Sequence, residues 1–386
     1  MLALRRTSPA LLSLILTVPA APATPRWDHP GYDAEDSYYN PHESAVVASS
    51  IGSLAKKWSV TLRHADETCT GSGPPVVRNG QVFVSDGLGV SAYSVKTGAR
   101  DWTFNVVDPV DTVTPTLAVD AGVLLVGTSS CRPSGSEQEL TALEADSGRI
   151  RWKRSQGQPM ASMVTDKGVV VVSGYSDIFD DAQTTAYRTS DGRMLWNKTG
   201  QVATDVSADG VVLIRKVGDD GDTPGTTTAV AIDTGVARWT RTGNWYAQAA
   251  DPAADRFYVI NGNGKLAALN VADGKVLWTK SIDADAEVTA GSHSVRLAVD
   301  GKRVYHAYQG AIDSLDAKTG KRRWRTKTTG DAQQPILAGG LIYTGGTVLN
   351  AAQGKPVGPS FTGDVVVAGG QLYQVNGKEL IVYSPS

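Results

Sequence analysis

The stretch SLDAKTGKRRW, Ser314–Trp324, decides the fold of this chain, because related copies of it recur along the sequence. Each copy has a small residue, a turn that ends in glycine, and a tryptophan four residues after that glycine. Their tryptophans follow one another at intervals of 39 to 50 residues. The copies are AYSVKTGARDW (92–102), ALEADSGRIRW (142–152), AYRTSDGRMLW (186–196), AIDTGVARW (231–239, taken as two residues shorter), ALNVADGKVLW (268–278) and SLDAKTGKRRW (314–324). Such a period indicates a fold built from repeated units.

Each copy predicts the end of one strand, a tight turn and a second strand that carries the tryptophan. The glycine supplies the positive φ that such a turn requires, and the small first residue leaves space for the large ring. Upstream of each copy lies a run of β-branched or aromatic residues, such as Val169–Val172 or Phe257–Ile260. With one further strand before that run, each unit has four antiparallel strands, which is the composition of a propeller blade.

Eight of these upstream runs predict an all-β, eight-bladed β-propeller of four-stranded antiparallel blades over residues 51–386. The seventh unit (348–357) keeps the glycine but lacks the tryptophan, and the eighth ends at about Tyr383. Since 51–58 (IGSLAKKW) is half a motif without its partner, we expect this N-terminal strand to complete the last blade and close the ring. The tryptophans expected to pack in the blades are Trp58, Trp102, Trp152, Trp196, Trp239, Trp278 and Trp324.

Residues 1–23 have the pattern of a signal peptide. Arg5 and Arg6 precede a short apolar run (10–18), and Ala21-Pro22-Ala23 offers a cleavage site. The run is too short to span a bilayer, so we expect a secreted or extracytoplasmic protein with no membrane span after cleavage. A retained anchor is the alternative. Residues 24–50 then form an N-terminal leader.

Composition and cysteine content narrow the functional classes. Lys and Arg (37) nearly balance Asp and Glu (39), which gives no reason to expect nucleic-acid binding. Cys69 falls in the connection that enters the first blade, and Cys131 in a loop on the same face of the second blade. In an oxidising compartment this placement favours a disulfide between them, with two free thiols as the alternative.

The connections between blades converge on one face of a propeller, and we expect any ligand to bind in the funnel there. Trp245 stands outside the tryptophan register and could stack on a flat ring or simply plug the funnel. Carboxylates and amides nearby could bind calcium or a polar ligand, although polar loops are often merely solvated. The candidate ligand-binding residues are Asp205, Trp245, Tyr246, Gln248, Glu287 and Gln333. Catalytic and metal-binding residues are not identified.

The repeat resembles the pyrroloquinoline-quinone (PQQ) repeat of quinoprotein dehydrogenases and their non-catalytic relatives, which include the propeller scaffold of the outer-membrane assembly machinery. The resemblance is carried by the Gly–Trp copies and the leader, and covers residues 27–386. It implies either a dehydrogenase that uses PQQ and calcium to oxidise an alcohol or sugar, or a scaffold.

The chain departs from the catalytic members of that family, because it lacks a vicinal cysteine pair and a haem-binding Cys-x-x-Cys-His. The first hypothesis is therefore a monomeric binding or scaffold protein whose partner is a protein or a small polar ligand. The alternatives are a compact PQQ- and calcium-dependent dehydrogenase, or another enzyme of the funnel such as a hydrolase or cyclase, so enzymatic activity stays open.

Overall fold

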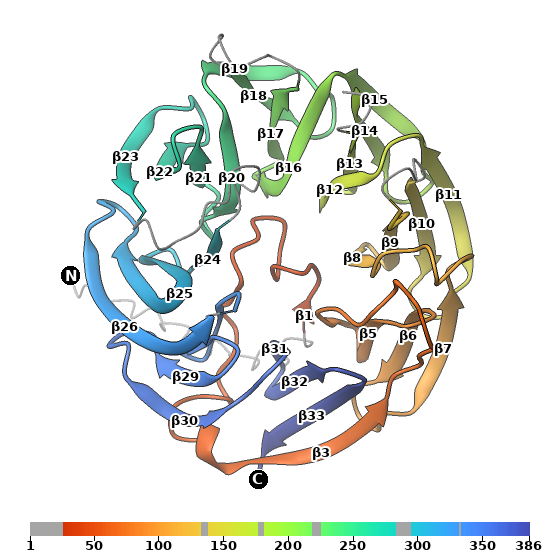
Figure 1. The fold of residues 1–386 in the computed structure, drawn as a ribbon, viewed down its shortest axis with the longest axis vertical. Coiled ribbons are helices and arrows are strands. Elements are labelled where there is room, and N and C mark those ends of the chain that lie inside the picture. Colours follow the sequence, from red (N-terminus) through yellow and green to blue (C-terminus); the bar gives the residue numbers. More distant parts are fainter. Residues whose placement is uncertain (1–25, 133–137, 177–180, 218–224, 283–294, 332) are drawn as a thin grey trace, which may run out of the picture.

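Eight β-sheets surround a central channel in the computed structural model of this chain (Figure 1). The structure describes residues 26–132, 138–176, 181–217, 225–282, 295–331 and 333–386. Apart from the 3-10 helix η1 (Ile51–Ser53), the regular structure of this part is all β, and it contains no helix long and apolar enough to cross a membrane. The predicted eight-bladed propeller is confirmed.

The blades follow one another around the ring in chain order, and the first strand of each blade lies innermost. The strands of blades 1 to 4 are β4 (Val76–Arg78), β5 (Gln81–Asp86), β6 (Gly89–Ser94) and β7 (Arg100–Asn105); β8 (Thr116–Asp120), β9 (Val123–Ser129), β10 (Gln138–Glu144) and β11 (Ile150–Gln156); β12 (Met160–Asp166), β13 (Val169–Ser176), β14 (Asp181–Arg188) and β15 (Met194–Thr199); β16 (Gln201–Ala208), β17 (Val211–Lys216), β18 (Thr226–Ala231) and β19 (Ala237–Thr242).

Blades 5 to 8 repeat this arrangement with two variations. In blade 6 one long strand, β25, pairs with β24 through its first half and with β26 through its second. In blade 8 the outermost strand comes from the N-terminal part of the chain. The strands are β20 (Trp245–Ala250), β21 (Arg256–Asn261), β22 (Lys265–Asn270) and β23 (Val276–Ser281); β24 (Arg296–Val299), β25 (Arg303–Asp316) and β26 (Arg322–Asp331); β27 (Ile336–Ala338), β28 (Leu341–Tyr343), β29 (Thr347–Asn350) and β30 (Pro356–Ser360); β31 (Asp364–Ala368), β32 (Gln371–Asn376), β33 (Glu379–Pro385) and β3 (Leu54–Thr61).

Ring closure occurs between the two ends of the propeller sequence. β3 pairs antiparallel with β33, from Leu54 opposite Pro385 to Thr61 opposite Glu379. The strand therefore covers an edge that would otherwise present unpaired backbone groups. The expectation that the N-terminal strand completes the last blade is confirmed.

The register of the repeat explains its small first residue and corrects one alignment. In blade 5 Ala268 lies directly opposite Trp278, and the pairing shifts at the next residue. In blade 4 the residue opposite Trp239 is Ala229 and not Ala231. The fourth copy is therefore AVAIDTGVARW (229–239), as long as the others; the shortened version was wrong because alanine occurs at both positions.

Each tryptophan of the repeat joins its own blade to the next one. The Trp102 indole lies against Gly148 in blade 2, and its Nε1 donates a hydrogen bond to the Ala145 carbonyl at 2.8 Å. All seven pairs share this contact, with Nε1–O distances of 2.8 to 3.3 Å. They are Trp58–Gly98, Trp102–Gly148, Trp152–Gly192, Trp196–Gly235, Trp239–Gly274, Trp278–Gly320 and Trp324–Gly354. At the remaining junction, between blades 7 and 8, Ile51 of η1 packs against Gly358.

The leader crosses one end of the channel, as the red-orange ribbon inside the ring shows (Figure 1). It enters as β1 (Arg26–Trp27), which pairs with β4, and leaves as β2 (Tyr39–Asn40), which runs parallel to β27. Between them its carbonyls accept hydrogen bonds of 2.6 to 2.8 Å from the inner strands of blades 2, 4, 5, 6 and 7. The donors are Val119, Ser207, Ala250, Val299 and Leu337. Because each of these residues is the last or second-to-last of its strand, the leader lies at the face of the glycine turns, opposite the funnel face.

Candidate functional site in the central funnel

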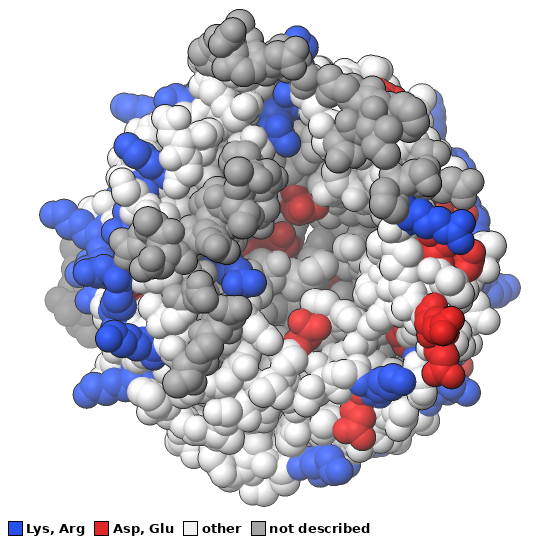
Figure 2. Space-filling model, viewed as in Figure 1, with Lys and Arg blue, Asp and Glu red and all other residues white. Residues whose placement is uncertain are grey.

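A cavity of about 400 Å³ occupies the channel above the leader. Its walls come from the starts of β8 and β12 and from the connection 113–115, and its floor from Pro30, Asp36 and Tyr38 of the leader. In the space-filling view a hollow lies at the centre of the funnel face, and Asp or Glu side chains are visible inside it (Figure 2). The leader thus turns an open channel into a pocket with one polar end.

Asp205 enters this cavity from an irregular part of β16. The pairing of β16 with β17 is interrupted between Ala203 and Ser207, and Asp205 lies in the interruption. Its Oδ1 accepts a hydrogen bond from the Met163 N–H at 2.9 Å. The Asp205 side chain is accessible to water on the cavity side. The protein that surrounds it on its other sides raises its pKa to about 6 by desolvation.

The leader adds three carboxylates in four residues. Burial raises the pKa of Asp36 well above its usual range, and the nearby Asp205 and Asp33 raise it further. The pKa of Asp33 rises to about 6 through burial, although hydrogen bonds from the Ser37 N–H and hydroxyl oppose the rise. Burial and the neighbouring Asp33 raise the pKa of Glu35 to about 8. At neutral pH this segment of the leader therefore holds protons on part of its carboxylates, and Asp36 is the one of the three that lines the cavity.

His29 lines the same cavity. Its Nε2 lies 2.9 Å from the Thr165 carbonyl oxygen, and a carbonyl can only accept, so Nε2 carries the proton. Burial lowers the pKa of His29, which keeps the ring neutral. Its Nδ1 is then a lone-pair acceptor, and it is buried without a hydrogen-bond partner.

A smaller cavity of about 200 Å³ adjoins the first one and shares Pro30, Tyr38 and Pro74 with it. Gln333 and Asp364 line it, and so does Arg296. Burial raises the pKa of Asp364. The leader residue Tyr38 therefore contacts both halves of the funnel.

The structure brings Asp205 and Gln333 to these cavities, but not the predicted residues of β20. Trp245, Tyr246 and Gln248 line neither of the two. The Arg241 guanidinium lies 4.8 Å from the Trp245 ring centre, and Trp245 Nε1 donates to the Thr242 carbonyl at 3.0 Å. Trp245 is half-buried against the apolar core between blades 4 and 5. A ligand ring on Trp245 stays a prediction.

The other two residues of β20 also have partners within the protein, and one predicted residue lies elsewhere. The Arg215 guanidinium lies 4.3 Å from the Tyr246 ring centre. Gln248 bonds to main-chain groups on both sides, since it accepts from the Val295 N–H and donates to the Tyr246 carbonyl. Glu287 lies outside the described residues.

Sequence reasoning missed the residues that matter most here, because it treated the leader as a lead-in to the propeller. The signal that could have found them is the acidic run Asp33-Ala34-Glu35-Asp36 just after Gly31. Positive φ angles at Tyr32, Asp36 and Tyr38 mark the same segment as backbone held in an unusual shape.

A second feature of the funnel face is a braced loop, residues 106–115, between β7 and β8. Cys69 and Cys131 form a disulfide with a Cα–Cα distance of 6.6 Å. The N–H groups of these two cysteines donate to the Pro109 and Asp111 carbonyls, and the Thr70 hydroxyl donates to the Thr112 carbonyl at 2.6 Å. On this loop Val107 is 90% exposed and Val110 is 56% exposed.

A family profile described as "Outer membrane protein assembly factor BamB" matches residues 31–163 and 136–353. The chain belongs to this family. The BamB of Shewanella oneidensis is 25% identical over 278 aligned residues, and the match covers 65% of this chain and 65% of that protein. The BamB of Yersinia pestis is 22% identical over 329 residues, 80% of this chain and 71% of that protein. The chain thus spans just under two thirds of the Shewanella relative.

Solved structures of a BamB protein and of a dehydrogenase have the same fold. The quinohemoprotein alcohol dehydrogenase of Comamonas testosteroni superposes with a TM-score of 0.68 at 15% identity, over 94% of this chain and 81% of that one. BamB of Moraxella catarrhalis superposes with a TM-score of 0.58 at 17% identity, over 86% of this chain and 99% of that one. These likenesses establish the propeller fold.

The larger cavity does not suit PQQ, the cofactor that the dehydrogenase alternative requires. PQQ carries three carboxylates, so its site needs positive charge. The lining instead includes Asp36 and Asp205 and has no lysine or arginine. Among the residues that the structure describes, no three His, Cys, Asp or Glu side chains are grouped to hold a metal such as calcium.

Proposed function

We propose that this chain is an extracytoplasmic scaffold that binds a protein partner through its funnel face, as part of outer-membrane protein assembly like its BamB relatives. The observation that carries the proposal is the exposure of Val107 and Val110 on the braced loop 106–115. Apolar patches that are exposed on a polar surface mark sites where proteins bind, and these two valines lie three residues apart on one loop. The disulfide supports an oxidising compartment.

The braced loop is suited to binding because it is already ordered. The Cys69–Cys131 disulfide and the bonds from Thr70 fix its backbone to two other segments. A partner that covers Val107 and Val110 therefore gains apolar contact without the entropic cost of ordering a loose loop. A cavity of about 200 Å³ beside Val107 is lined by Phe104 and Thr128 and could take one side chain of the partner.

The charges around the loop define the partner's chemistry. Asp66, Glu67 and Asp108 are exposed, and acidic side chains, with some basic ones among them, are visible over the β7–β11 side of this face (Figure 2). The exposed Arg132 is already paired with Asp111 of the loop. Such a surface attracts basic groups and repels acidic ones. The partner's surface should therefore be apolar at its centre and carry Lys or Arg around it.

Photo-crosslinking tests this proposal. A photoreactive amino acid replaces Val107 or Val110 in the full chain, and a third variant carries it at Val236, which is 63% exposed in the β18–β19 turn on the opposite face. Both loop positions should give the same adduct in cells of the source organism, and Val236 should not. The partner identified by mass spectrometry is then purified.

Direct binding to that purified partner decides the outcome. Val110→Asp should weaken the affinity at least about tenfold, because it places a charge at an apolar contact. Unchanged affinity, or equal crosslinking from Val236, would contradict the proposal. Alcohol oxidation by the protein with added PQQ and calcium, above a blank without protein, would show an enzymatic role instead.

A further inference from the structure

We propose that the larger funnel cavity is a binding site for an organic cation, an ammonium or guanidinium group on a short apolar stem. This site goes beyond the scaffold role and does not depend on it, because it concerns the channel and not the braced loop. Three observations carry it: uncompensated carboxylates, an unpartnered acceptor, and apolar walls around a cavity of suitable size.

The carboxylates that face the cavity lack a cation. Asp36 comes from the leader and Asp205 from β16, and in the described part of the chain no ion pair involves either of them. Asp28, eight residues earlier in the leader, shows the contrast, since Arg26 and Arg78 both bind it. The Met163 N–H donates to Asp205, but this hydrogen bond does not neutralise the carboxylate. A cation that enters the cavity would supply the opposite charge that Asp36 and Asp205 lack.

His29 is the second observation and is independent of the carboxylates. Its side chain is 8% exposed, lines the same cavity, and has a buried Nδ1 without a hydrogen-bond partner. Since Nε2 is already committed to the Thr165 carbonyl, Nδ1 can only accept. The lining thus contains an unpaired neutral acceptor as well as two carboxylates, and this set suits a ligand with several N–H donors.

The size and the apolar part of the wall exclude a bare metal ion as the natural occupant. A volume of about 400 Å³ falls within the range of small-molecule sites. Met160, Met163 and Leu117 form apolar parts of the lining, which suit a carbon stem. The ligand is defined by a shared chemistry, because a free small amine or guanidine and a Lys or Arg side chain of a partner present the same group.

Calorimetry at about pH 8 tests the proposal with matched probes of similar length. n-Butylammonium and n-butylguanidinium should bind, whereas the neutral 1-pentanol and the anionic butyrate should not. The tripeptide acetyl-Gly-Lys-Gly-amide distinguishes the source. Tighter binding of the peptide than of butylammonium supports a partner's side chain, and weaker binding supports a free amine. Equal binding of pentanol or butyrate would overturn the proposal.

Substitution of each aspartate by asparagine removes the negative charge but keeps the size and shape of the side chain. Asp36→Asn keeps a residue that tolerates the positive φ of 47° at this position, and Asp205→Asn keeps an acceptor for the Met163 N–H. Each should weaken butylammonium binding by roughly tenfold, the scale of a hydrogen bond to a charged group. The control Asp233→Asn, at an exposed turn on the opposite face, should leave binding unchanged. Unchanged affinity in the Asp36→Asn/Asp205→Asn double variant would overturn the proposal.

A measurement on the unmutated protein tests the same site without relying on variants that could fail to fold. Met160 and Met163 line the cavity, whereas Met194 is 58% exposed on the outer strand β15. With ¹³C-labelled methionine methyl groups, butylammonium should shift the Met160 and Met163 signals and leave the Met194 signal in place. Saturable shifts confined to the first two support the site. Their absence, or equal shifts of all three, contradicts it.

Discussion

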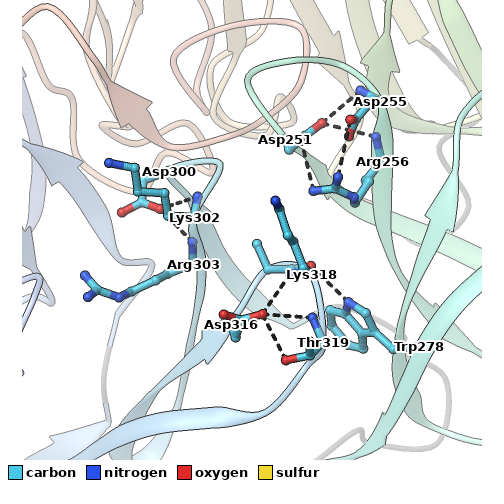
Figure 3. A network of polar contacts seen from close by, with 11 residues as sticks. Asp251, Asp255, Arg256, Trp278, Asp300, Lys302, Arg303, Asp316, Lys318 and Thr319 are labelled. Carbon is cyan, nitrogen blue, oxygen red and sulfur yellow. Dashed lines mark hydrogen bonds and ion pairs between the residues drawn. The ribbon is translucent and has the colours of Figure 1, made fainter.

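Trp278 of blade 5 lies against Gly320 of blade 6 so closely that a Cβ atom on the glycine would fall 2.6 Å from the indole ring. The indole Nε1 donates to the Ala317 carbonyl at 3.0 Å in the same turn. Asp316 accepts hydrogen bonds from the Lys318 and Thr319 N–H groups and fixes the shape of that turn (Figure 3). The repeat motif is therefore a device that links neighbouring blades.

The glycine half of this contact can be tested by alanine substitution. Gly320→Ala adds two penalties, a positive φ of 67° and a collision with the Trp278 ring. The matched control is Gly264→Ala, where φ is 69° and no atom lies within 4 Å of the added Cβ. The control should lose about 1–2 kcal/mol of unfolding free energy, and Gly320→Ala clearly more. Equal losses in urea unfolding would contradict close packing at Gly320.

Two substitutions of Trp278 separate the contribution of ring packing to stability from that of the Nε1–H hydrogen bond. Trp278 is 8% exposed, so Trp278→Ala should cost about 3–5 kcal/mol of stability. Trp278→Phe keeps a ring but loses the Nε1–H, and should cost less. Chemical denaturation of the three proteins measures both differences. An unchanged unfolding midpoint in Trp278→Ala would show that the contact does not hold the blades together.

The propeller could be predicted from the sequence because each repeat contains the residues that its turn and its packing contact require. A glycine that needs positive φ and a tryptophan four residues later recur in register, and the half-motif ending at Trp58 reveals the closure. The site could not be predicted in the same way. Residues such as Asp36 and Asp205 are 169 positions apart, and they meet only because the leader crosses the channel. No local periodicity records such a crossing.

Acidic residues of the leader should make the stability of the protein fall as the pH rises. The pKa of Glu35 is about 8 in the folded state, above its ordinary value of 4.5, so folding favours the protonated form. The stabilisation is complete below about pH 4.5 and is lost as the pH rises through about 8. Asp33, whose folded pKa is about 6, and Asp205, with the same value, act in the same direction at lower pH.

Thermal unfolding of the wild type and of Glu35→Gln between about pH 6 and pH 9 measures this effect. The amide cannot ionise, so the melting temperature of the variant should fall less steeply over this window. Asp33 and Asp166 repel the Glu35 carboxylate, whereas Arg26 favours it, and all three stay in place in the variant. Identical slopes in the two proteins would mean that Glu35 does not titrate in the channel.

Reduction of the Cys69–Cys131 disulfide should destabilise the funnel face. The bond spans 62 residues of sequence, so it should contribute about 2–4 kcal/mol by restricting the unfolded chain. A reductant should lower the unfolding midpoint of the wild type, and Cys69→Ser/Cys131→Ser should show the lower midpoint without it. The double variant should not respond to reductant; if it lost as much stability as the wild type, the effect would not come from this bond. Because Val107 and Val110 lie on the loop that the bond braces, the double variant should also bind the protein partner more weakly.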